Sequence, residues 1–437
     1  MTVPPLDVGP TQVEVRIASL DIARGIALCG ILLMNITMFG LPFAYGDPTV
    51  AGGSTGPDLW AWITTSMFFE GTQRGLFSIL FGAGLIIMTA SLDRSTRPHA
   101  PDFFFRRNLW LIVFGIIHGF LILWTGEILF YYGATALFVY GFRNATPRTM
   151  LNVAIGGLIF NAAWNGLDTY NALEKHRAYV VADSAKTAGD SLSPKQTAAI
   201  EAWQGLVKDF KPDTAKINKE IRVKQGGYAG IVVLQAPRLT HGQSWWLYRG
   251  FFDIFSMMLI GMALFKLGVF GAEHATKRYW TMVIVGYGIG LTTNYLEVTE
   301  LIRSEFSVLA FFETGITYDL GRLAMTMGHL GLIMLFCRAT GFRWLKASLA
   351  AIGRTAFSNY ILTSVICAFV FYGFGLGLYG ELRRHELYYV VAAIWLFQLI
   401  ASPLWLSRFR FGPLEFVWRW LTYGERPRMQ GAAGATE

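Results

Sequence analysis

The chain has 437 residues, of which 53% are hydrophobic and only 15% are charged, and its formal net charge is +8. A soluble domain carries about 25% charged residues, so this composition excludes a soluble enzyme, a disordered tail and a fibrous protein. The apolar residues form runs of about 20 residues, the length that a bilayer core requires of a helix. The sequence therefore predicts an all-α polytopic membrane protein surrounded by membrane lipids.

About ten transmembrane helices are predicted in chain order. They cover residues 20–40, 66–91, 106–125, 127–143, 149–169, 248–270, 277–297, 318–338, 355–377 and 387–407. The apolar pattern that contains the second span, from 59 to 92, would make a helix of about 50 Å, too long for one upright crossing. We expect an interfacial stretch there, followed by a break near Gly71.

The predicted spans divide the chain into two halves of five, residues 1–171 and 246–411, with a tail at 412–437. The segment between the halves, 172–245, is rich in lysine and periodic enough for two or three amphipathic helices. We expect this helical insertion on the extracytoplasmic side, because long loops cross the membrane largely regardless of charge. It is either a spacer between the halves or a lid that gates a substrate.

Basic residues gather in short loops on one side of the ten-span arrangement, whereas the facing connection 41–58 contains no Lys or Arg. The basic segments are 92–107, 143–148, 266–278, 338–346 and the C-terminal tail. Cytoplasmic loops are enriched in Lys and Arg, so both termini are predicted in the cytoplasm. This enrichment accounts for the net positive charge without a nucleic acid partner.

Polar residues inside the first span form the first candidate site. A charged side chain in hydrocarbon costs about 2.5–3.5 kcal/mol, so each one is a functional candidate. Arg24 and Asn35 are eleven residues apart and share a helix face, separated by about 16 Å along it. Asp21 can pair with Arg24 at the cytoplasmic end. A structural ion pair and an interhelical amide explain these residues equally well.

The third span repeats this spacing with Arg107 and His118, which places the histidine near the middle of the membrane. A lone His among apolar residues is commonly a satisfied hydrogen-bonding group between helices. The alternative is catalytic, since neutral imidazole can remove a proton from a hydroxyl or amine nucleophile. Glu127, at the outer end of the span, either orients a substrate or is an ordinary solvated helix terminus.

The remaining intramembrane candidates are scattered over three spans. Glu70 and Arg74 are four residues apart, in the order that favours a helical ion pair. Arg322, Arg354 and Asn359 complete the set of polar candidates. The three cysteines have no spacing typical of metal ligands, so no metal site is predicted.

Four stretches of the sequence resemble the YeiB-like family, bacterial inner-membrane proteins of unknown function. The stretches are RIASLDIARGIALCGILLMN, RGLFSILFGAG, GIIHGFLILWTGEILFYYGA, and the pair IGRTAFSNYILTS and FGPLEFVWRWLTYG. They follow one another along nearly the whole chain. The resemblance implies a multi-pass protein of the bacterial inner membrane.

That family is similar to transmembrane acyltransferases such as heparan-alpha-glucosaminide N-acetyltransferase. The similarity lies in the pattern L-D-x-x-R-G followed by Asn, here Leu20, Asp21, Arg24, Gly25 and Asn35. It implies acyl transfer from cytoplasmic acyl-CoA to an acceptor on the far side, such as a glycan or a lipid head group. The catalytic His that the acetyltransferases place after the first span is absent from 36–58, and Glu127 stands where the family usually has Asp.

Two functions from different classes follow from these residues. In an acyltransferase, Arg24, Arg107 and Arg74 would bind acyl-CoA, and His118, Asn35 and Glu127 would form the catalytic group. In a transporter or lipid-handling carrier, the same groups would line a path for a polar or anionic solute. Asp21, Glu70, Arg322, Arg354 and Asn359 are structural or accessory polar residues in either case. The chain works alone or as a homodimer.

Overall fold

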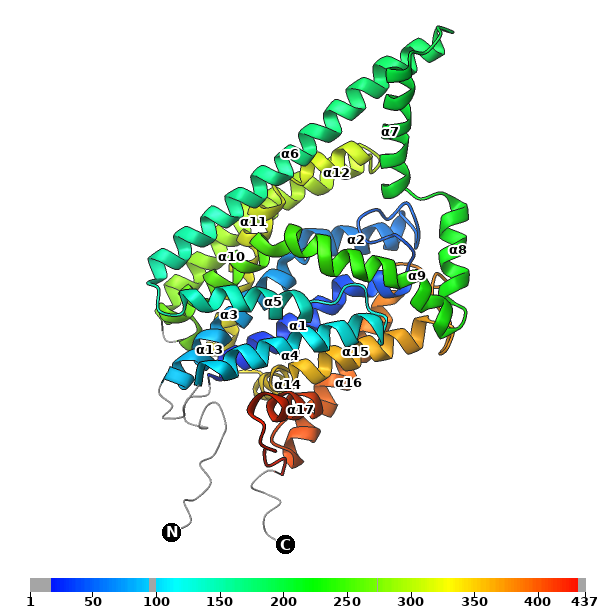
Figure 1. The fold of residues 1–437 in the computed structure, drawn as a ribbon. Helices are drawn as coiled ribbons and strands as arrows, with labels where there is room; N and C mark the ends of the chain where they lie inside the picture. Colours follow the sequence, from blue (N-terminus) through cyan, green and yellow to red (C-terminus); the bar gives the residue numbers. More distant parts are fainter. Residues whose placement is uncertain (1–16, 94–99, 273, 431–437) are drawn as a thin grey trace, which may run out of the picture.

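The computed structural model describes residues 17–93, 100–272 and 274–430. The described part of the chain is helical throughout, and its only β-type pairing is an isolated bridge between Phe409 and Gln430. The predicted all-α polytopic class is confirmed. Figure 1 shows the helices gathered into one bundle, with α6 projecting beyond it.

The helices follow the order of the sequence. They are α1 (Ala18–Gly40), α2 (Gly56–Phe68), α3 (Thr72–Asp93), α4 (Ala100–Phe120), α5 (Leu129–Val139), α6 (Pro147–Thr187), α7 (Pro194–Phe210), α8 (Thr214–Lys224), α9 (Tyr228–His241), α10 (Leu247–Lys266), α11 (Thr276–Arg303), α12 (Val308–Thr314), α13 (Tyr318–Arg338), α14 (Arg343–Arg354), α15 (Ala356–Phe371), α16 (Leu387–Arg408) and α17 (Pro413–Tyr423).

Fewer helices qualify as membrane spans than the sequence predicts. Within the described residues, seven helices are long and apolar enough to cross a membrane, or eight if the pair α14 and α15, bent by 85°, is one span. The expected number of about ten is therefore not reached. The fourth expected span is the short helix α5 with the turn after it, and the seventh, α11, is long enough at 28 residues but too polar.

The predicted break near Gly71 is present. Helix α2 ends at Phe68 and α3 begins at Thr72, and Gly71 lies between them with a φ of 64°. Two features of the structure require glycine at this position. Glycine tolerates positive φ, and a Cβ atom here would collide with the Tyr318 hydroxyl and with Arg322. The break therefore brings the backbone against α13.

Close helix contacts hold the centre of the bundle together. Gly82 of α3 and Gly261 of α10 let these two helices touch through their backbones, because a Cβ at either position would collide with the carbonyl of Met258 or Ile79. Small residues are typical of such contacts in membranes.

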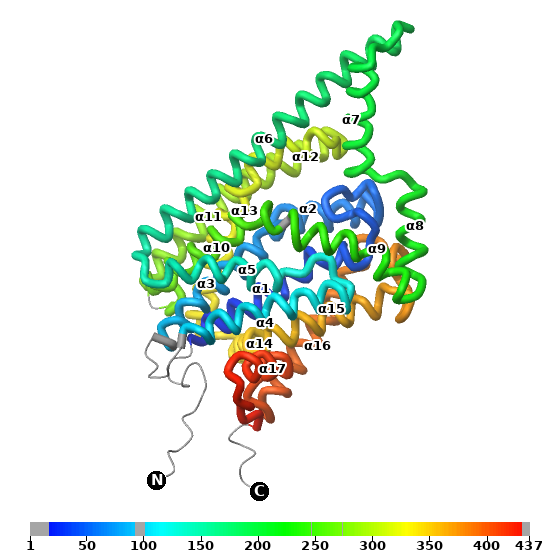
Figure 2. Tube along the Cα trace, in the orientation of Figure 1, coloured from blue at the N-terminus to red at the C-terminus, as the bar shows by residue number. Residues whose placement is uncertain are grey.

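The insertion does not begin at the boundary that the sequence predicts. Helix α6 runs without interruption through 41 residues, so the expected end of the first half at residue 171 lies inside a continuous helix. Helix α7 returns from its tip, beginning with a capping box at Ser193 and Gln196. Figure 2 shows α7, α8 and α9 leading the chain back to the bundle.

Both ends of the described chain lie on one side of the bundle. The hydroxyl of Ser19, at the start of α1, donates to the carbonyl of Phe270, just after α10. The Trp418 indole of α17 donates to the carbonyl of Arg107 in the first half of α4. In Figure 1, α17 lies at the bottom, and α7 with the tip of α6 lies at the top. We call these the terminal side and the insertion side.

Candidate functional site

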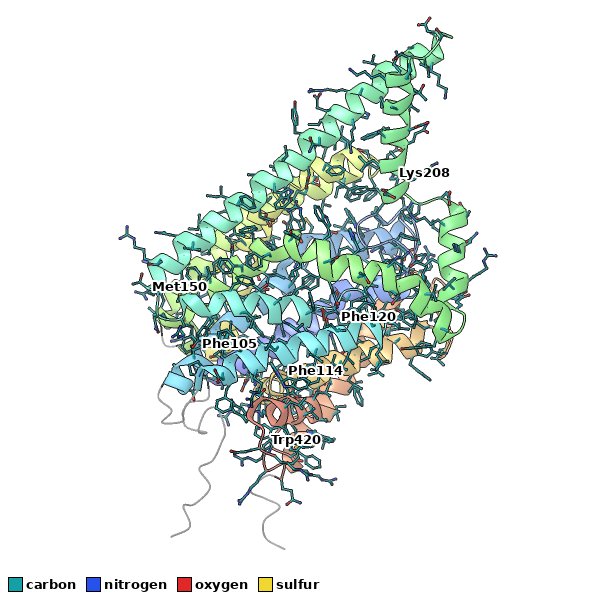
Figure 3. All side chains as sticks on the ribbon, viewed as in Figure 1. Phe105, Phe114, Phe120, Met150, Lys208 and Trp420 are labelled. Atoms are coloured by element: carbon teal, nitrogen blue, oxygen red, sulfur yellow. The ribbon has the colours of Figure 1, made fainter. Side chains whose placement is uncertain are left out.

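His118 is enclosed by the bundle and has no hydrogen-bond partner among the described residues. Its relative exposure is 0%, and both ring nitrogens are unsatisfied. Phe114, one turn earlier on α4 and labelled in Figure 3, contacts the ring of Phe357 near the start of α15. Buried polar groups are nearly always hydrogen-bonded. His118 is therefore not the satisfied hydrogen-bonding group between helices that its sequence context favours.

Tyr360 connects His118 to Asn35. Its ring meets the His118 imidazole edge to face, with centroids 5.0 Å apart. Tyr360 also lines a cavity of about 10 Å³ together with Asn35 of α1 and with Thr363 and Ser364 of α15. That volume holds about one water molecule. The cavity lies between α1 and α15, its other lining residues are the apolar Leu28, Ile31, Leu32 and Phe39, and His118 is not among the residues that line it. Tyr360, which sequence reasoning missed, contacts His118 and also lines this cavity.

Glu127 is buried and engaged by backbone groups. Its carboxylate accepts hydrogen bonds from the N–H groups of Leu129 and Phe130, both at 3.0 Å, and the residue is only 3% exposed. These donors belong to the first turn of α5, whose N–H groups lack helical partners. The alternative of an ordinary solvated terminus is wrong. Glu127 stabilises the start of α5 beside the aromatic cluster around His118.

Arg24 and Arg107 approach each other on the terminal side. Arg107 lies within electrostatic range of both Arg24 and Arg419, and its guanidinium stacks 3.6 Å above the Trp418 ring. Arg24 forms the predicted ion pair with Asp21, at 3.4 Å between Nη1 and Oδ1. Three guanidinium groups from α1, α4 and α17 therefore form a cationic cluster.

A second polar cluster gathers around Arg322, which is 2% exposed. Its Nη2 atom lies 2.5 Å from Oδ1 of Asp253 and 2.8 Å from Oδ1 of Asp319. Arg74 contacts the other oxygen of Asp253 at 3.3 Å. Glu70 accepts from the hydroxyl of Tyr318 at 3.3 Å. The structure thus brings together three predicted residues from α3, α13 and the α2–α3 break.

Glu70 and Arg74 lie within electrostatic range of each other but form no direct ion pair in the described part of the chain, so the predicted helical pair is wrong in its geometry. The chain leaves helical geometry at Gly71, between them, so the spacing of four residues no longer places the side chains on one helix face. Arg74 pairs with Asp253 of α10 instead. Asp253 and Asp319 were missed, although the rule that marks intramembrane charges as functional applies equally to both.

The Arg322 cluster borders a cavity of about 200 Å³. The cavity lies between α2, α11, α12 and α13, and the residues around it are Tyr45, Gly46, Trp62, Ser66, Glu70, Asn294, Glu297, Val298, Leu301, Phe311, Thr314, Gly315, Tyr318 and Arg322. Glu297 accepts from the Thr317 hydroxyl at 2.6 Å. This cavity is larger than the cavity beside Tyr360.

Asn359 and Arg354 lie at the bend between α14 and α15. Asn359 donates to Thr355 at 2.8 Å and to Ser402 of α16 at 3.0 Å, which is an interhelical contact. Arg354 is the last residue of α14, where the chain bends by 85° into α15. Both positions therefore belong to the structure of the bend.

The comparisons with known proteins agree with the sequence resemblance. Residues 264–425 match a family described as "Protein of unknown function (DUF418)". Over 95% of its length the chain is 29% identical to the uncharacterized protein YxaH of Bacillus subtilis, covering 96% of that protein. Over 93% it is 28% identical to the uncharacterized protein YeiB of Escherichia coli, covering 96% of it. The YeiB-like resemblance is confirmed.

No solved structure matches this chain significantly. The relatives are described as uncharacterized, so they assign no chemistry to either cluster. The similarity to acyltransferases stays a prediction. The helices and the comparisons together support a multi-pass integral membrane protein whose sequence resembles YeiB and YxaH.

Proposed function

We propose that this protein is a membrane-bound acyltransferase that passes an acyl group from acyl-CoA on the terminal side to an acceptor such as a glycan or a lipid head group. The observation that carries the proposal is the unsatisfied His118 imidazole. A structural His in a bundle would have a hydrogen-bond partner, whereas a general base keeps its ring nitrogen free for substrate.

The cationic cluster supports the donor end of this reaction. Arg24 and Arg107 lie eleven residues, about 16 Å of helix, before Asn35 and His118 on α1 and α4. Guanidinium groups bind phosphate oxygens well. The phosphates of acyl-CoA would bind at Arg24 and Arg107, with the thioester reaching towards Tyr360.

In the proposed reaction, a His118 nitrogen removes the proton from the acceptor hydroxyl or amine as that atom bonds to the thioester carbonyl carbon. The Asn35 amide donates to the oxygen on which charge develops. The carbon–sulfur bond then breaks, and the CoA thiolate takes the proton from His118. Because the hollow beside Tyr360 holds about one water, the substrates must displace the Tyr360 side chain.

The test measures transfer of a radiolabelled acetyl group from acetyl-CoA by purified protein in nanodiscs, with glycan and lipid acceptors. We expect His118→Ala to abolish turnover. His329→Ala is the matched control, because His329 is a half-buried histidine of α13 whose Nδ1 lies 2.9 Å from the carbonyl of Met325. Turnover that survives in His118→Ala rejects the assigned base.

A carrier remains the second candidate because of the 200 Å³ cavity beside the α2–α3 break. Interrupted helices with polar groups near the membrane centre are typical of transporters. A carrier predicts flux of a polar solute into proteoliposomes without acyl transfer. Flux that is unaffected by His118→Ala but lost on substitution of Glu70 would favour this alternative.

A further inference from the structure

We propose that the 200 Å³ cavity between α2, α11, α12 and α13 is a binding site for a small primary amine that also carries a hydroxyl or carboxylate group. We call it the Glu70–Glu297 cavity. The inference does not depend on acyl transfer, because it rests on the charge and the shape of this cavity alone. It holds whether the amine is an acceptor, a cargo or a regulator.

The charges around the cavity are unequal. Four carboxylates, those of Glu70, Glu297, Asp253 and Asp319, face two guanidinium groups, those of Arg74 and Arg322. Asp253 contacts Arg74 and Arg322, Asp319 contacts Arg322, and Glu70 lies within electrostatic range of both guanidinium groups. The excess negative charge therefore falls mainly on Glu297, which lines the cavity and accepts from the Thr317 hydroxyl. Uncompensated buried charges cost several kcal/mol. A cation between Glu70 and Glu297 would compensate them.

An organic ammonium fits this position better than a metal ion. Within the described residues, no group of three or more His, Cys, Asp and Glu side chains could hold a metal. The cavity is instead walled by the rings of Tyr45, Trp62, Phe311 and Tyr318. Aromatic faces attract ammonium groups, and a volume of 200 Å³ exceeds what a bare ion requires.

Arg322 adds a second recognition group. Its Nε–H donor is buried and has no hydrogen-bond partner, although the Nη2 atom of the same side chain is paired. Arg322 lines the cavity and is 2% exposed. A buried donor without an acceptor costs free energy, which a bound acceptor would recover. A hydroxyl or carboxylate on the ligand would supply it, while the amine of the same molecule meets Glu70 and Glu297.

The insertion contacts one wall of this cavity. Phe311 lines it and lies 6.3 Å, ring to ring, from Phe210 at the end of α7. Lys211, the next residue, lies 3.5 Å from Asp47 and donates to the carbonyl of Glu305. The ligand would therefore enter from the insertion side, past a contact between the insertion and the bundle.

The experiment uses the full chain in nanodiscs and measures binding of ethanolamine by calorimetry and by thermal unfolding, with ethylene glycol as the uncharged match. We expect saturable ethanolamine binding and no comparable response to ethylene glycol. Glu297→Gln and Glu70→Gln should each weaken binding about tenfold or more, since each removes one charged partner. Glu300→Gln is the control, because Glu300 pairs with Arg303 outside the cavity.

Equal responses to ethanolamine and ethylene glycol would overturn the proposal, as would unchanged affinity in Glu297→Gln. Folding of each variant is checked by its unfolding temperature without ligand. His118→Ala should bind ethanolamine normally. Loss of acyl transfer with retained ethanolamine binding, or the reverse, therefore separates failure of this inference from failure of the proposed function.

Discussion

At the scale of single residues, two side chains decide how the polar interior is interpreted. His118 has no hydrogen-bond partner in the described part of the chain, which favours a chemical role. Arg322 has two carboxylate partners and one unsatisfied nitrogen, which makes it both a structural centre and a cavity wall. The rule that an ionisable residue inside the membrane is a functional candidate selected both residues. Only their contacts in the folded protein distinguish a candidate base from the centre of an ion-pair network.

Replacing Arg322 with methionine should destabilise the protein by about 3–5 kcal/mol, because Asp319 would lose its cationic partner and Asp253 would keep only Arg74 beside its buried charge. Thermal or denaturant unfolding in detergent measures this loss. Arg303→Met is the matched control, since its ion pair with Glu300 is exposed and should contribute about 0–1 kcal/mol. Similar losses in both variants would contradict the buried network.

Lys224 offers a test of pH dependence outside the membrane spans. Burial lowers the pKa of its ammonium group to about 8, although Glu220 lies 3.4 Å away and acts in the opposite direction. Between pH 8 and the ordinary pKa of 10.5, the unfolded chain binds more protons at this site than the folded chain. The contribution of Lys224 to stability therefore rises with pH across this window.

The variant Lys224→Met removes this titration. We expect the stability difference, wild type minus variant, to increase from pH 8 to pH 10.5, as measured by chemical unfolding at fixed ionic strength. Lys219→Met, on the same helix at an exposed position, should show no such trend. A wild-type advantage that stays constant with pH would contradict the burial of the ammonium group.

At the scale of elements, the break between α2 and α3 creates the Glu70–Glu297 cavity. An uninterrupted helix would carry Glu70 and Arg74 on one face as a pair. The turn at Gly71 separates them, presents Glu70 to Tyr45 and Tyr318, and leaves Arg74 to Asp253. The backbone break at Gly71 therefore places Glu70 in the wall of the Glu70–Glu297 cavity instead of on one helix face with Arg74.

Gly71→Ala should therefore cost about 1–3 kcal/mol, because the residue must keep positive φ and its new methyl group meets Tyr318 and Arg322. It should also weaken ethanolamine binding. Gly141→Ala is the control, since a Cβ there meets open space and φ is not positive. Unfolding temperatures report the difference, and equal stability of the two variants would argue against a strained break.

At the scale of the whole molecule, the terminal side and the insertion side are chemically distinct. The terminal side carries the cationic cluster of Arg24, Arg107 and Arg419, and the insertion side carries the acidic cavity under α12. We expect the terminal side in the cytoplasm of a bacterial inner membrane, because basic loops are retained there.

Cysteine labelling tests this orientation in intact cells. After replacement of the three native cysteines, we expect Asp190→Cys at the tip of the insertion to react with a membrane-impermeant maleimide, and Arg426→Cys to react only after lysis. Both introduced positions are exposed, so access to the reagent depends on membrane sidedness. The reverse pattern would invert the proposed topology and the direction of acyl transfer.

The sequence by itself determined the polytopic helical class, the break near Gly71, the ion pair of Asp21 with Arg24 and the helical insertion. Each of these depends on run length, glycine or short-range spacing, which local chemistry fixes. Only the tertiary structure placed Tyr360 against His118 and in the cavity that Asn35 lines, and Asp253 beside Arg74 and Arg322. Those contacts join residues from different helices. Which helices meet depends on how they pack against one another through close backbone contacts, and this packing cannot be read from the spacing of residues along one helix.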